Sequence, residues 1–92
     1  MSGYTIAFTN QFKKDAKRCV KRNYDILLLE EMMILLRTNG AVPLKYKAHL
    51  LSGNYNGYWE CHIKSDWLLI WLQDDVSCDI TLVRTGTHSD LF

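Results

Sequence analysis

The stretch that determines the fold is YWECHIKSDWLLIWL, which runs from Tyr58 to Leu72. In its first half, polar and apolar side chains alternate, as they do along a strand. One face would carry an apolar set that suits a core, and the opposite face would carry polar groups that a ligand can reach. The apolar set is Trp59, Cys61 and Ile63, and the accessible set is Tyr58, Glu60 and His62.

A turn at residues 64–66 leads into a second strand, residues 67–72, which is apolar at every position. A strand that is apolar on both faces is expected at the centre of a sheet. A polar turn at residues 73–77 then precedes a third strand, Asp79 to Arg84. This part of the chain therefore predicts an antiparallel meander.

The N-terminal third predicts one short strand, Tyr4 to Phe8, followed by two helices. Thr9 or Asn10 can cap the first helix and Asp25 the second, which ends at Asn39-Gly40. The second helix is apolar over more than one face, and we expect its excess width to contact a partner chain. The apolar stripes are Phe12, Ala16, Cys19 and Val20 in the first helix, and Leu29, Met32, Met33 and Leu36 in the second.

The 92 residues make one domain, 1–92, with the element order β-α-α-β-β-β. This order predicts an α+β fold in which two N-terminal helices pack on one face of a small antiparallel sheet. The other face stays partly open as a site. No apolar run reaches membrane-spanning length and the N-terminus lacks signal-peptide features, so we expect a cytoplasmic protein that makes no membrane contact.

The three cysteines show no C-x-x-C spacing, and their odd number disfavours a disulfide framework. A zinc site that includes Cys61 and His62 is a weak alternative, because neighbours on a strand point to opposite faces. We expect reduced cysteines that act as small hydrophobic residues, with no metal and no cofactor.

The net charge of +1 conceals an asymmetry between the two parts of the chain. Residues 1–22 carry six Lys or Arg against one acid, whereas residues 23–92 carry five against nine. The basic part is either a footprint for a polyanion or simply a solvated helix face, and charge alone favours neither.

The three histidines His49, His62 and His88 lie among Gly, Asp, Arg and aromatic residues. Two histidines can serve as base and acid at one centre, Asp66 can orient an imidazole or keep it protonated, and Arg84 can hold a phosphate. Aromatic side chains can stack on bases. Such parts suit metal-free RNA cleavage, in which a base activates the ribose 2′-hydroxyl for attack on the adjacent phosphate.

Each of these residues also has a plain structural explanation. His49 can be a loop residue, His62 can pair with Glu60, and His88 can lie in a loose tail. Asp66 suits a turn and Trp67 suits a core. Only the convergence of the set would make a site.

Three motifs resemble the YafQ branch of the RelE/ParE toxin superfamily, whose members include ribosome-dependent messenger-RNA endonucleases. The likeness covers essentially the whole chain. The motifs are Leu44-x-Tyr46-Lys47-x-His49-x-Leu51-x-Gly53, Gly57-Tyr58-x-x-x-His62-x-x-x-Asp66-Trp67-x-Leu69-Ile70, and Arg84-Thr85-Gly86-Thr87-His88-x-x-Leu91-Phe92.

The resemblance implies a RelE-like fold that docks in the ribosomal decoding centre and cuts the messenger in the A site. It implies His88 as general acid, and His62 or His49, helped by Asp66, as base. Arg84 would steady the phosphate, and Phe92 or Trp67 would pack on a base. The basic surface that faces RNA or the ribosome would be Lys13, Lys17, Arg18, Lys45 and Lys47.

Two departures from the family pattern bear on the site. Leu50 stands where the family often has proline, which affects the loop that carries His49, and the near-neutral net charge shifts the weight of RNA binding to the N-terminal helix and the two lysines near residue 46. The competing functions are a ParE-like toxin that binds a protein target such as gyrase without catalysis, and an inactive structural domain. Either toxin would have an antitoxin whose disordered segment wraps it.

Overall fold

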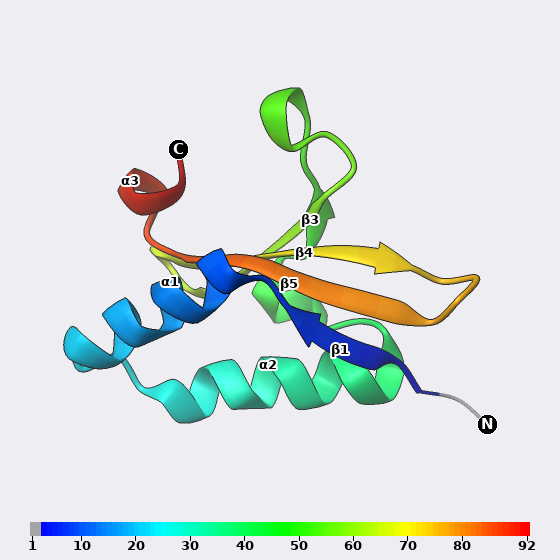
Figure 1. Cartoon of the computed structure of the whole chain (residues 1–92), viewed down its shortest axis with the longest axis horizontal. Helices are drawn as coiled ribbons and strands as arrows, with labels where there is room; N and C mark the ends of the chain where they lie inside the picture. The colour runs from blue at the N-terminus through cyan, green and yellow to red at the C-terminus, as the bar shows by residue number, and fades with distance from the viewer. Residues whose placement is uncertain (1–2) are drawn as a thin grey trace.

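A computed structural model describes residues 3–92 and contains five strands and three α-helices. The sheet has the order β1-β5-β4-β3-β2. Figure 1 shows α1 and α2 beneath the sheet, while α3 and the loop after β2 stand on its other side. The elements are β1 (Thr5–Phe8), α1 (Asn10–Lys21), α2 (Ile26–Asn39), the short 3₁₀ helices η1 (Leu44–Tyr46) and η2 (Gly53–Tyr55), β2 (His49–Leu50), β3 (Trp59–Lys64), β4 (Trp67–Asp74), β5 (Asp79–Gly86) and α3 (His88–Leu91).

The strand β4 lies between β3 and β5 and pairs antiparallel with both, which confirms its predicted central place. Its alternate side chains enter two separate cores. Trp67, Leu69 and Trp71 join the large cluster that the helices cover, and Leu68 and Ile70 join a small cluster on the opposite face. Leu91, Leu51, Tyr55 and Tyr58 complete that second cluster, so α3 and the loop after β2 are fastened to the face that carries the histidines.

Both long helices begin, and α2 also ends, where the sequence predicts. The hydroxyl of Thr9 accepts the backbone N–H of Phe12, and the carboxylate of Asp25 accepts that of Leu27. Gly40 adopts a left-handed φ of 65° and donates its N–H to the carbonyl of Leu36, which closes α2. The stripe of α2 is buried as expected at Leu29, Met32 and Leu36.

The sheet is mixed rather than purely antiparallel, because β1 pairs in parallel with β5, from Thr5 opposite Asp79 to Phe8 opposite Leu82. The two helices α1 and α2 connect β1 to the antiparallel strands. In the sheet, β1 is the edge strand next to β5. Alternation within a strand carries no information on the direction of its partner, so the sequence did not reveal this pairing. It also missed β2 and α3, which are too short to produce a period.

The predicted stripe of α1 is wrong at one position. Val20 was expected in the core but is 54% exposed, whereas Asp15, which was not part of the predicted stripe, is fully buried. All three cysteines are free, and Cys19 and Cys61 are buried. Burial raises the pKa of the Cys61 thiol to about 12, as expected for a small hydrophobic residue that stays protonated. Within residues 3–92, no helix is both long and apolar enough to cross a membrane.

Candidate active site

The three histidines form a row on the sheet face opposite α1 and α2. His49 lies on β2, His62 on β3 and His88 at the start of α3. The ring centres of His49 and His62 are 6.2 Å apart, and those of His62 and His88 are 6.1 Å apart. Segments that are distant in sequence thus bring together all three predicted histidines.

A buried carboxylate, Glu60, lies beside the first two histidines. Its Oε1 is 3.3 Å from Nε2 of His49 and 3.9 Å from Nε2 of His62. Its Oε2 is buried and has no hydrogen-bond partner among the described residues. Glu60 was not among the predicted site residues, although the alternation of β3 had already placed it on the same face as His62.

The ring of His49 lies between a backbone carbonyl and the carboxylate of Glu60. Nδ1 of His49 lies 2.9 Å from the carbonyl oxygen of Lys47, which can only accept, so Nδ1 carries a hydrogen. Nε2 then faces Oε1 of Glu60. The carbonyl and the carboxylate together fix the orientation of the His49 ring.

The carboxylate of Asp66 orients His88 and not the other two histidines, which differs from the predicted pairing. Its Oδ1 accepts the backbone N–H of His88 at 3.0 Å and lies 2.9 Å from Nδ1 of the same residue. The backbone and side-chain hydrogen bonds from His88 hold the pKa of Asp66 below its usual range. With Nδ1 engaged, Nε2 of His88 remains available to a substrate.

Of the two predicted base-stacking residues, only Phe92 has an accessible ring. Phe92 is 64% exposed, and its ring centre lies 6.2 Å from that of His88 and 5.4 Å from that of Tyr55. Trp67 is 3% exposed, packs on Tyr24 and donates its indole N–H to Thr85 Oγ1 at 2.9 Å. The buried ring of Trp67 supports the site from the core.

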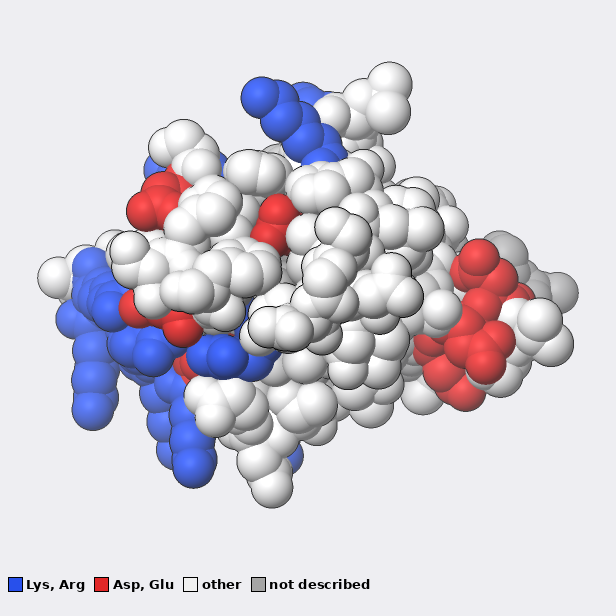
Figure 2. All heavy atoms as spheres, turned by 90° about the horizontal axis from the view of Figure 1, so that it is seen from above, with Lys and Arg blue, Asp and Glu red and all other residues white. Residues whose placement is uncertain are grey.

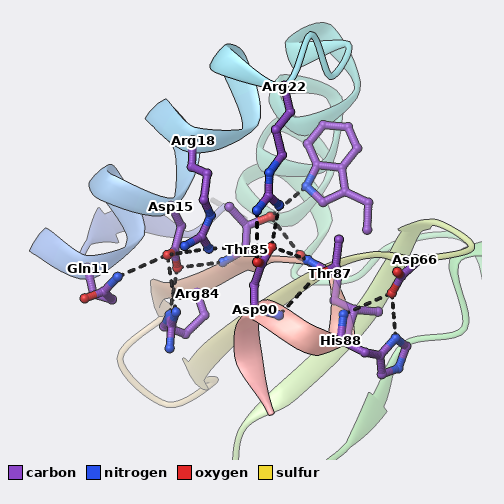
Figure 3. Close-up of polar contacts among 12 residues, drawn as sticks. Gln11, Asp15, Arg18, Arg22, Asp66, Arg84, Thr85, Thr87, His88 and Asp90 are labelled. Atoms are coloured by element: carbon purple, nitrogen blue, oxygen red, sulfur yellow. Dashed lines mark hydrogen bonds and ion pairs between the residues drawn. The ribbon is translucent and has the colours of Figure 1, made fainter.

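Arg84 is held by the buried Asp15 (Figure 3). Its Nε donates to Asp15 Oδ2 at 2.7 Å and its Nη2 to Oδ1 at 3.3 Å, and this pairing raises the pKa of the guanidinium. The same carboxylate accepts the backbone N–H of Thr85, the amide of Gln11 and an N–H of Arg18. Asp15 therefore fastens α1 to β5, and it engages Nε and Nη2 of Arg84 but not Nη1.

A second carboxylate, Asp90, fixes α3 against the end of α1. It accepts two hydrogen bonds from Arg22, at 2.6 and 3.1 Å, and lies 3.7 Å from Arg18. It also forms a reciprocal capping box with Thr87, which is why a helix of four residues can exist at all. These contacts, led by the one to Arg22, hold the pKa of Asp90 well below its usual range. Arg18 and Arg22 thus position the helix that carries His88.

The other predicted basic residues are exposed. Lys13 and Lys17 on α1, like Lys45 and Lys47 around η1, form no ion pair within the described part of the chain. Figure 2 shows most Lys and Arg atoms gathered at the α1 end of the molecule, with a smaller group apart from them and an acidic patch at the opposite end. No group of three His, Cys, Asp or Glu side chains in residues 3–92 could hold a metal ion.

Comparison with known proteins identifies the family. Residues 4–92 match the family described as the bacterial toxin of a type II toxin–antitoxin system, YafQ. The chain belongs to the YafQ toxin family. The predicted resemblance and the RelE-like α+β fold are thereby confirmed.

Relatives of known function or structure cover nearly the whole chain. The mRNA interferase toxin YafQ of Escherichia coli is 39% identical over 88 residues, which span 95% of this chain and 94% of that protein. A crystal structure of E. coli YafQ superposes with a TM-score of 0.87 at 36% identity, covering 97% of this chain and 98% of the other. YafQ in the E. coli DinJ–YafQ toxin–antitoxin complex gives 0.88 at 37% identity and covers 99% of both chains.

Replacing Asp15 should strongly destabilise the domain. The Asp15→Asn variant would turn an amide N–H toward Arg84 and leave the partly exposed guanidinium without its counter-ion, which costs about 1–3 kcal/mol of the free energy of unfolding. Urea unfolding followed by circular dichroism measures the change. The matched control is Asp79→Asn, because Asp79 is exposed and forms no side-chain hydrogen bond within residues 3–92. Equal stability of the two variants would contradict the role given to Asp15.

The contribution of Asp90 should depend on pH. Because folding lowers the pKa of this carboxyl, its stabilisation is present above the ordinary value of about 3.9 and is lost as the pH falls through the lowered pKa. Asp90→Asn should therefore cost roughly 1–2 kcal/mol at pH 6 and less at pH 3. Urea unfolding of both proteins at the two pH values tests this, and a pH-independent difference would show that the charge of Asp90 is irrelevant.

Proposed function

We propose that this toxin is an endoribonuclease that cleaves messenger RNA in the ribosomal A site by metal-independent acid–base catalysis. The observation that carries the proposal is the row of three histidines, two of them beside Glu60 and the third held by Asp66. A protein that acts only by binding has no need of such proton-handling pairs. The E. coli relative named as an mRNA interferase supports the same conclusion.

In the proposed reaction, the group formed by His49, Glu60 and His62 takes the proton from the ribose 2′-hydroxyl. The 2′-oxygen attacks the neighbouring phosphorus, the bond to the 5′-oxygen breaks, and His88 donates a proton to that leaving oxygen. Asp66 holds Nδ1 of His88 and so orients the ring with Nε2 toward the leaving oxygen. The strand that loses the 5′-oxygen ends in a 2′,3′-cyclic phosphate, so atoms and charges balance.

The remaining parts of the site position the substrate. Nη1 of Arg84 can donate to a phosphate oxygen while Asp15 holds the rest of the guanidinium. The exposed ring of Phe92, next to His88, can stack on a base. Lys13 and Lys17 on α1, with Lys45 and Lys47, supply the positive surface for RNA, ribosomal or messenger.

The partners of this toxin follow from the same proposal. Cleavage during translation requires the toxin to work in the cytoplasm, on the ribosome and its messenger. The DinJ–YafQ complex of the relative supports a cognate antitoxin as the second partner. Leu27 and Ile34 on α2 and Val20 on α1 are exposed and give that antitoxin apolar surface to cover.

Induced expression with primer extension on a translated messenger tests the proposal. The wild-type chain should arrest growth and produce cuts at in-frame codons, whereas His88→Ala should lower cleavage by about 10²–10⁴-fold, the usual contribution of a general acid. The control variant Asp79→Asn changes an exposed residue at the start of β5, outside the histidine row and the basic surface, and should cut like wild type.

Growth arrest that survives the His88→Ala change while the messenger stays intact would overturn the catalytic proposal. It would favour the ParE-like alternative, in which the toxin binds a protein target such as DNA gyrase. Circular dichroism of the variant shows whether the fold is retained, because Asp66 also bonds the backbone of residue 88 and not only its ring.

A further inference from the structure

A groove with a volume of about 570 Å³ runs beside His62, between η1, the start of α2 and the end of β3. Its walls carry the lysines Lys45, Lys47 and Lys64 and the ring of Tyr46, and Ile63 lies in its buried floor. His62 also lines it, so the groove is continuous with the histidine row.

The three lysines give this groove uncompensated positive charge. None of them forms an ion pair within residues 3–92, in contrast to Arg18, Arg22 and Arg84. Lys64 and Lys45 come from different elements, the end of β3 and η1, yet they line the same hollow. Three lysine side chains that line one groove attract an anion such as a phosphate.

The ring of Tyr46 is held in a defined orientation. Its hydroxyl donates to Glu31 at 3.3 Å, and the ammonium of Lys45 lies 5.1 Å from the ring centre. An aromatic face beside clustered lysines is the combination that single-stranded RNA-binding surfaces use, with stacking for the base and charge for the backbone. A purely acidic peptide would need the charge but not the aromatic face.

We propose that this lysine groove binds the messenger nucleotide next to the scissile phosphate, with its phosphate among Lys45, Lys47 and Lys64 and its base against Tyr46. The proposal rests on the ribonuclease function above and adds Lys64 and Tyr46 to the substrate-binding residues. In this arrangement the groove sets the position of the RNA relative to His62, and charge outside α1 holds the substrate.

The test is an NMR titration of the whole chain with a single-stranded pentaribonucleotide that carries 2′-O-methyl groups throughout. This probe has no 2′-hydroxyl that could attack a phosphate, so it is not cleaved and its binding can be measured separately from catalysis. We expect saturable shifts at Tyr46, Ile63 and Lys64. Lys45→Gln/Lys64→Gln should weaken binding roughly tenfold and flatten its dependence on salt.

The matched control is Lys21→Gln/Arg37→Gln, which removes the same charge from helix positions that do not line the groove and should weaken binding less than twofold. Equal weakening by the two double variants, or shifts confined to α1, would overturn the groove as an RNA site. A groove that binds the probe in a toxin that cuts no messenger would instead refute the ribonuclease function and leave the groove intact.

Discussion

The buried carboxylate of Asp15 is the constraint on which the site depends. It accepts hydrogen bonds from Arg84, Arg18, Gln11 and the backbone of Thr85, and so joins the middle of α1 to the end of β5. The chain turns into α3 directly after that strand end. A buried charge of this kind is stable only with its partners in place, so the register of α1 on the sheet determines where α3 begins.

From this anchor, polar contacts continue to the histidine. Arg18 and Arg22 reach Asp90, Asp90 caps α3, and α3 presents His88 to Asp66 on the β3–β4 turn. The two arginines at the end of α1 are therefore engaged in contacts within the protein, whereas Lys13 and Lys17 are not. The histidine row contains carboxylate–imidazole pairs of its own.

The sequence predicted much of the fold because its signals are local. Alternation from Tyr58 to Ile63 separated a core face from an accessible face, and the uniformly apolar run of residues 67–72 identified the central strand. Caps at Thr9, Asp25 and Gly40 predicted the helix ends. The parallel pairing of β1 and the four-residue helix α3 depend on tertiary contacts, which leave no period in the chain.

The sequence predicted which histidines come together in the candidate site, but not which carboxylate contacts which histidine. All three histidines converge, yet Asp66 turned out to contact His88, and the carboxylate beside His49 and His62 is Glu60. Asp15 was missed because a charged residue among basic neighbours on a helix normally faces solvent. The burial of Trp67, by contrast, agrees with its apolar position in a central strand.

The most direct test of the account is the chemistry of the RNA ends after cleavage. Attack by the ribose 2′-hydroxyl, with His88 as the acid, predicts a 2′,3′-cyclic phosphate or its 3′-phosphate hydrolysis product on one fragment and a 5′-hydroxyl on the other. Mass spectrometry of the fragments, or end labelling with a kinase that accepts only a 5′-hydroxyl, distinguishes these ends. A 5′-phosphate and a free 3′-hydroxyl would contradict the proposed chemistry of the histidine row.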